Sequence, residues 1–243
     1  MNFGTDGDSI TEGMQWSWYV FEHLGFASHC NTAVGGAVWC KRTFDTSAGK
    51  VSSQDYASPG FAGISGGWEP TADPAELQRR VNNCAPVHIA GYLDKIKKGE
   101  AFPPDIFVFA LGTNDQEETY GSAEEALASE EPDLYTSAGA MCACIRSISD
   151  SFPSCEVFVL TPIQTASREH NRKIERMISD IFVPITSALG VRLIDCFHNC
   201  IINEVNEREF GEGLFLKDGL HPNSSGILQQ GKFITREILK VIG

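Results

Sequence analysis

Residues 105–111 read Asp105-Ile106-Phe107-Val108-Phe109-Ala110-Leu111, an apolar run bounded by Pro103-Pro104 and Gly112. A continuous apolar run of this length between turn residues is typical of a strand buried on both faces of a parallel sheet. Weaker apolar runs predict further strands, which lie at residues 1–5, 28–34, 156–160 and 191–195.

Helical patterns separate these strands. The spacing of apolar side chains predicts helices at 13–24, at 74–97 with a break near Pro86, at 134–151, at 167–189 and at 224–241. Pro184 predicts a kink in the fourth helix, Gly190 predicts its end, and Asn223 or Ser224 is expected to cap the last one. Alternating strands and helices indicate an α/β fold with a parallel sheet of about five strands. A chain of 243 residues is expected to form one domain over 1–243.

Two segments are expected to be long loops. Residues 41–73 are rich in Gly and Ser and contain Tyr56, Phe61 and Trp68, whereas residues 116–133 are strongly acidic. Both would leave the carboxyl ends of strands, where open α/β sheets bind their ligands. The aromatic side chains could stack on a sugar or line an acyl chain, or they could simply pack the loop.

The charge balance limits the partners of the chain. With 32 acidic and 19 basic residues, the net charge is -13, which argues against nucleic acid and anionic membranes as partners. No run is apolar for the length of a membrane span. A basic segment followed by an apolar one, as in a secretion signal, is not visible, so we expect a cytoplasmic chain or a secreted one without its leader. Composition leaves the oligomeric state open.

Eight cysteines are too few for a disulfide scaffold of this length. Cys142 and Cys144 would point to different faces of a helix, and Cys196 with Cys200 has no matching second pair at zinc-finger spacing. We therefore expect free, mostly buried thiols, no metal site and no cofactor.

Ser9 follows Gly7-Asp8 at the end of the first predicted strand. A glycine there allows a tight turn into a helix, which would present the Ser9 hydroxyl and its backbone N–H at the edge of the sheet. The alternative is a capping box, in which Ser9 caps the helix together with Glu12.

His221 lies three residues after Asp218 in the run Asp218-Gly219-Leu220-His221-Pro222. On a turn, this spacing lets the carboxylate hold Nδ1–H of the ring and leaves Nε2 free to accept a proton from a serine. The other five histidines have no partner in a matching motif and are interpreted as structural: His23, His29, His88, His170 and His198.

Asn114 follows the strongest strand in the run Gly112-Thr113-Asn114-Asp115, and Gly36 lies in Val34-Gly35-Gly36-Ala37. The Asn114 amide and the Gly36 backbone N–H could both donate hydrogen bonds to an oxyanion. An Asx turn and a flexible turn are the alternatives.

These four blocks, in this order, resemble the GDSL/SGNH hydrolase superfamily from Gly7 to Pro222. The resemblance implies a flavodoxin-like three-layer α/β/α sandwich. It also implies a triad of Ser9, Asp218 and His221, and an oxyanion hole formed by Ser9, Gly36 and Asn114. The first block ends in Ile10 where the family name has Leu. Gly36 is preferred to Gly35 because it lies five residues after Asn31, which is the usual spacing in the family.

The resemblance implies a serine esterase. The acidic loop and the aromatic side chains favour short acyl esters, such as acetylated carbohydrate, with Asp8, Trp39 and Trp68 as substrate-binding residues. The acidic loop would repel phosphorylated substrates. The alternatives are a lysophospholipase or thioesterase-type lipase acting on longer acyl chains, an O-acyltransferase, and a non-catalytic carbohydrate-binding module of the same fold. Neither the Gly-x-Ser-x-Gly motif nor a nucleotide-binding glycine loop occurs at the corresponding places.

Overall fold

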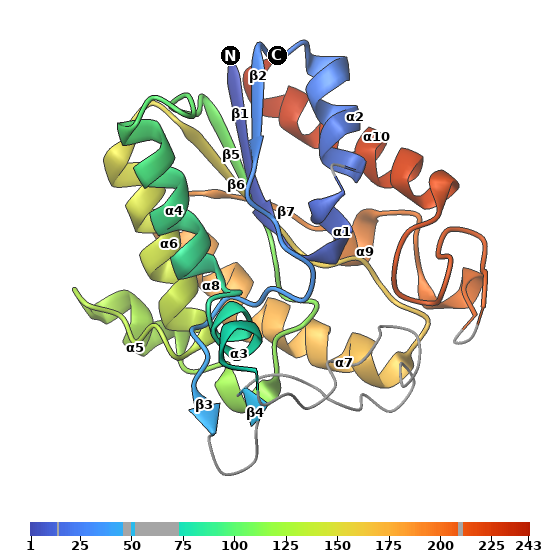
Figure 1. The fold of residues 1–243 in the computed structure, drawn as a ribbon. Helices are drawn as coiled ribbons and strands as arrows, with labels where there is room; N and C mark the ends of the chain where they lie inside the picture. The colour runs from blue at the N-terminus through green and yellow to red at the C-terminus, as the bar shows by residue number, and fades with distance from the viewer. Residues whose placement is uncertain (14, 46–49, 52–72, 209–210) are drawn as a thin grey trace.

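The computed structural model describes residues 1–13, 15–45, 50–51, 73–208 and 211–243. Its centre is a sheet of five parallel strands in the order β2-β1-β5-β6-β7 (Figure 1). The strands are β1 Asn2–Gly7, β2 Ser28–Asn31, β5 Ile106–Ala110, β6 Glu156–Leu160 and β7 Arg192–Ile194. The predicted α/β class and the parallel sheet are confirmed. A separate antiparallel pair consists of β3 Phe44–Asp45 and β4 Lys50–Val51.

The side chains of β5 alternate between the two faces of the sheet, as those of every strand do. Phe107 and Phe109 belong to one core cluster with α4 Ala85–Lys97, α6 Ser137–Ser151 and α8 Val183–Leu189. Ile106 and Val108 belong to another with α2 Gln15–Leu24 and α10 Ser224–Ile242. Helices therefore cover both faces, which gives the three layers seen in Figure 1.

The predicted helices are present, with local differences. The first corresponds to α2, and the short helix α1 Ser9–Glu12 precedes the predicted range. The second is divided into α3 Pro74–Val81 and α4. The fourth contains α7 Arg168–Met177, a π-helical turn at Ile178–Phe182 and α8, whose first turn holds Pro184. Because proline has no N–H to donate, the regular ladder is interrupted there. Gly190 ends α8 with a left-handed φ of 68°, and Asn223 caps α10.

Residues 116–133 do not form the single long loop that we expected. They contain a 3-10 turn at Glu117–Thr119 and the helix α5 Ala123–Ala128, which Ser122 caps. Arg176 Nη1 on α7 pairs with Glu117 Oε1 at 2.7 Å. Most of the other predicted loop, including Tyr56, Phe61 and Trp68, lies outside the described residues. The shorter elements near the C-terminus are α9 Cys196–Asn199 and a 3-10 turn at Glu204–Asn206.

The predicted state of the cysteines is confirmed: all eight are free thiols, six of them buried. None of the helices in the described ranges is long and apolar enough to cross a membrane.

Candidate active site

Ser9 stands at the turn between β1 and α1. The side chain of Asp8 caps α1, because its Oδ1 accepts a hydrogen bond from the Ile10 N–H at 3.0 Å. A Cβ added to Gly7 would lie 2.6 Å from Thr11 Oγ1 and 2.9 Å from the Ala110 carbonyl oxygen, so the turn needs glycine there. The capping-box alternative for Ser9 is therefore wrong, and the Ser9 hydroxyl is available for another partner.

That partner is His221. Ser9 Oγ lies 2.9 Å from His221 Nε2, although 212 positions separate the two residues in the chain. On the other side of the ring, His221 Nδ1 lies 2.9 Å from Asp218 Oδ2. The structure thus brings together all three residues of the predicted triad, in the order hydroxyl, imidazole and carboxylate.

A tight turn orients the carboxylate of Asp218. Its Oδ1 accepts hydrogen bonds from the backbone N–H groups of Leu220 at 3.1 Å and His221 at 2.7 Å, and Gly219 between them has a φ of 82°. Burial alone would raise the pKa of Asp218, but these bonds and the His221 ring hold the pKa below its usual value. The carboxylate is therefore kept ionised and directed at Nδ1.

Glu207 supports the segment that leads into this turn, a role that sequence analysis missed. Its two carboxylate oxygens accept the backbone N–H groups of Phe215 and Leu216, both at 2.9 Å. Burial raises the pKa of Glu207, against these two hydrogen bonds. No pattern in the sequence links position 207 to positions eight and nine residues later.

The Gly35-Gly36 turn lies against the nucleophile. A Cβ added to Gly35 would lie 3.7 Å from Ser9 Cβ. Asn83 Nδ2 donates to the Gly35 carbonyl oxygen at 2.7 Å. In a trans peptide the carbonyl of one residue and the N–H of the next point in opposite directions, so the Gly36 N–H faces away from Asn83. Within the described part of the chain, no hydrogen bond occupies the Ser9 or Gly36 N–H. Both donors fit the predicted oxyanion hole.

Asn114 is attached to the same turn. Its Nδ2 donates one hydrogen bond to the Ala37 carbonyl at 3.0 Å, which leaves the second N–H of the amide for another acceptor. The neighbouring Asp115 accepts the Trp39 N–H with both oxygens at 3.2 Å and the Ser137 hydroxyl at 2.6 Å. Asp115 therefore holds the second and third sequence blocks together, which the sequence did not reveal.

Two buried carboxyl groups support this region. Burial raises the pKa of Asp8 to about 7, with the nearby Asp115 and Asp6 adding to the effect and the Ile10 N–H and Thr113 hydroxyl opposing it. Burial likewise raises the pKa of Asp115 to about 6, against its hydrogen bonds from Ser137 and Trp39.

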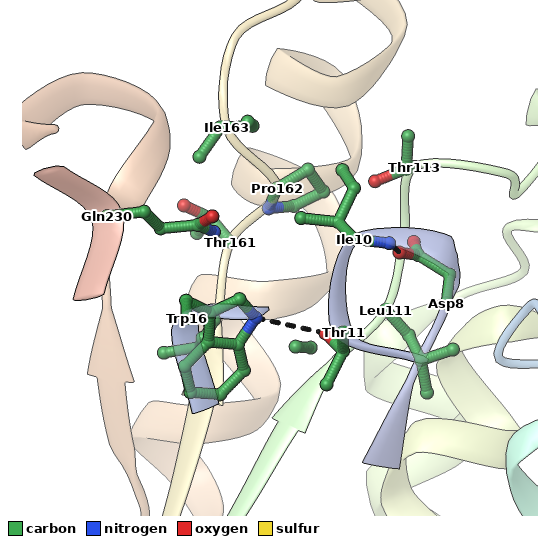
Figure 2. A pocket seen from close by; sticks show the side chains of 12 residues that line it. Asp8, Ile10, Thr11, Trp16, Leu111, Thr113, Thr161, Pro162, Ile163 and Gln230 are labelled. Carbon is green, nitrogen blue, oxygen red and sulfur yellow. Dashed lines mark hydrogen bonds between the residues drawn. The ribbon is translucent and has the colours of Figure 1, made fainter. Parts of the chain in front are cut away.

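The substrate-binding predictions need correction where the structure describes them. Trp39 is fully buried and its ring packs on Phe109, with centroids 5.4 Å apart, so it offers no face to a ligand. Asp8 is 1% exposed and lines a small cavity of about 20 Å³ together with Thr113 and Gln230 (Figure 2). Neither Ser9 nor His221 lines that cavity, so Asp8 faces the interior behind α1. Trp68 lies outside the described residues.

Two of the histidines interpreted as structural have a carboxylate partner. His198 Nδ1 lies 2.8 Å from Asp195 Oδ2, three residues earlier, and His88 Nδ1 lies 2.9 Å from Asp6 Oδ1. The expectation for His198 was wrong, because the sequence does contain an Asp three residues before it. Among the residues with described positions, no group of three or more His, Cys, Asp or Glu side chains could hold a metal ion.

Comparison with known proteins agrees with this geometry. The sequence profile of the GDSL-like lipase/acylhydrolase family matches residues 7–227. No curated protein sequence matches the chain at a significant level.

Solved structures resemble the whole chain. A possible lipase from Chitinophaga pinensis has a TM-score of 0.61 and 13% identity, with 99% of this chain and 98% of that chain covered. A carbohydrate acetylesterase from Sinorhizobium meliloti has a TM-score of 0.55 and 14% identity, with 99% of each chain covered. A carbohydrate esterase family 3 protein from Talaromyces cellulolyticus has a TM-score of 0.53 and 19% identity, covering 100% of this chain and 98% of that one. At these identities the likeness is one of fold.

Proposed function

Because the chain belongs to the GDSL-like lipase/acylhydrolase family and is a carboxylic ester hydrolase, we propose that it cleaves short acyl esters through Ser9, His221 and Asp218. One observation carries the proposal: Ser9 Oγ, His221 Nε2, His221 Nδ1 and Asp218 Oδ2 form a chain with two contacts of 2.9 Å. A nucleophile, a base and a group that orients the base need this order.

The reaction proceeds in two steps. His221 Nε2 accepts the proton of Ser9 as Ser9 Oγ attacks the ester carbonyl, and the resulting oxyanion accepts hydrogen bonds from the Ser9 and Gly36 N–H groups and the Asn114 amide. His221 then gives the proton to the departing alcohol, which leaves an acyl group on Ser9. A water molecule, deprotonated by His221, attacks this acyl group and releases the acid.

The proposed substrate is a neutral short acyl ester, with acetylated carbohydrate as the leading candidate. Two proteins of similar fold are named as carbohydrate esterases, which supports an acetylated carbohydrate as the substrate. The charge of the chain adds a second argument, since a net charge of -13 disfavours polyanionic substrates such as acyl-CoA.

Rates of hydrolysis for acetyl, butyryl and octanoyl esters of 4-nitrophenol, together with acetate release from an acetylated sugar, test this function. We expect the acetyl ester to be preferred, and Ser9→Ala to abolish the activity while the exposed Ser151→Ala retains it. A preference for octanoyl would overturn the substrate class. Full activity in Ser9→Ala would overturn the mechanism, and transfer to an added alcohol in place of water would indicate an acyltransferase.

A further inference from the structure

Glu12 lies beside the proposed nucleophile. It is the last residue of α1, three positions after Ser9, which places the two side chains on the same side of the turn. A Cβ added to Gly35 would lie 2.9 Å from Glu12 Oε2 and 3.7 Å from Ser9 Cβ. Glu12 Oε2 and Ser9 Cβ both lie close to this one point. The distance between these two atoms is therefore at most the sum of the two short distances.

The carboxylate of Glu12 is available to a ligand. Asp8 caps α1, so Glu12 has no part in a capping box, and its side chain is exposed. Across the described residues it forms neither a hydrogen bond nor an ion pair through its carboxylate. The backbone around it is fixed, because Asn31 Nδ2 donates to the Thr11 carbonyl at 2.9 Å and contacts the Glu12 carbonyl at 3.4 Å.

In the described part of the chain, Arg79 is a cation near this carboxylate. The guanidinium of Arg79 on α3 is close enough for Glu12 to raise its pKa slightly, but Glu76 has the larger effect. Arg79 donates to Glu76 twice, at 2.8 and 2.9 Å, while no ion pair within 4.0 Å joins it to Glu12. Arg79 therefore weakens the negative field of Glu12 without forming a contact that cancels it.

We propose that Glu12 is a specificity-determining residue, whose carboxylate at the Gly35 side of the site disfavours esters that carry a negative charge close to the scissile carbonyl. This inference rests on the proposed function, because it assumes that esters react at Ser9. Repulsion between two like charges about 6 Å apart lowers kcat/KM by about 3-fold at the dielectric constant of water and by about 100-fold at the value typical near a protein surface. The physiological ester would then be neutral or cationic around its reacting group.

Two matched pairs of esters test the proposal. One pair compares 4-nitrophenyl butyrate with the 4-nitrophenyl monoester of succinic acid, which carries its charge on the acyl side. The other compares the methyl ester of 4-acetoxybenzoic acid with the free 4-acetoxybenzoate, which carries its charge on the alcohol side. For each pair, the ratio of kcat/KM for the anionic ester to that for the neutral ester is measured at low salt.

We expect Glu12→Gln to raise this ratio by about 3-fold to 100-fold in at least one pair, and we expect the gain to shrink in 1 M salt because salt screens exposed charges. The pair that responds identifies the part of the substrate nearest Glu12. Glu22→Gln, which removes an exposed carboxylate on α2, is the control and should leave both ratios unchanged.

Ratios in Glu12→Gln that match those in Glu22→Gln for both pairs would overturn the proposal. A failure of the proposed function gives a different result, since neither the wild type nor the variants would then hydrolyse the neutral esters in a way that depends on Ser9. Because each ratio is taken within one protein, a partly unfolded variant does not disturb it.

Discussion

The protein contains two Asp-x-x-His turns with nearly the same geometry. In Asp218–His221 the contact from Nδ1 to the carboxylate measures 2.9 Å, and in Asp195–His198 it measures 2.8 Å. Each Asp also accepts the backbone N–H of its own His, at 2.7 and 3.1 Å respectively. In the contacts between aspartate and histidine, the two turns are therefore equivalent.

They differ in what the second ring nitrogen meets. Nε2 of His221 faces Ser9 Oγ at 2.9 Å, and the side chain is 16% exposed. Nε2 of His198 faces Glu175 Oε1 at 4.0 Å, and the side chain is 46% exposed. A local sequence pattern therefore builds an oriented imidazole, but only the fold can supply the nucleophile opposite to it.

Replacing each histidine should produce the largest difference in kcat between the two turns. His221→Ala should lower kcat for an acetyl ester by about 10⁴- to 10⁶-fold, since loss of the base disables the triad as a unit. His198→Ala should change kcat less than about twofold, because exposed positions away from the site contribute little. Steady-state kinetics of both variants check this, and comparable losses would show that the two turns share a role.

Replacing each aspartate tests how the two carboxylates orient their histidines, and the expected difference in kcat is the next largest. Asp218→Asn should lower kcat by about 10⁴-fold, because the amide favours the wrong tautomer of His221. Asp195→Asn retains an acceptor for the backbone N–H of His198 and should leave kcat nearly unchanged. The same assay measures both, and a small loss in Asp218→Asn would argue that His221 is oriented by other contacts.

Asn114 separates the two regions in another way, because in the proposed mechanism its amide donates to the oxyanion that forms at Ser9. Asn114→Ala should lower kcat by about 100- to 1000-fold with a smaller change in KM. Circular dichroism controls for loss of its hydrogen bond to the Ala37 carbonyl. An unchanged kcat in a folded variant would remove Asn114 from the oxyanion hole.

The smallest effect concerns stability around α1, whose cap Asp8 has a pKa raised to about 7 by burial. A carboxyl group with a raised native pKa binds its proton more tightly when folded, so its contribution to stability is lost as pH rises from about 4 to about 7. Asp8→Asn cannot ionise and still caps the helix. Its melting temperature relative to the wild type should therefore increase between pH 5 and pH 8, and a constant difference would contradict the raised pKa.

Much of the fold could be predicted because its signals are local. The strand around Phe107 and the end of α8 at Gly190 depend on neighbouring residues, and each appears in the structure where it was expected. The four blocks also indicated the site, because strands that run in parallel bring their carboxyl ends to one edge.

Other features depend on contacts that no local pattern encodes. Asp8 and Ser9 are both of residue types that cap helices, and only the folded chain shows that Asp8 caps α1 while Ser9 contacts His221. Trp39 is predicted to bind substrate, but its backbone N–H bonds to Asp115 and its ring is buried in the core. Likewise, the hydrogen bonds of Glu207 to Phe215 and Leu216 form between segments that meet only in the folded chain.

Covalent labelling of Ser9 tests the central claim most directly. An organophosphorus fluoride reacts much faster with an activated serine than with an ordinary one, and the serine Oγ bonds to phosphorus as fluoride leaves. Mass spectrometry of the labelled protein should find the adduct on Ser9 in the wild type and in His198→Ala, and only a trace of it in His221→Ala. Labelling of Ser9 at an equal rate in His221→Ala, or an adduct on a different serine, would contradict the account.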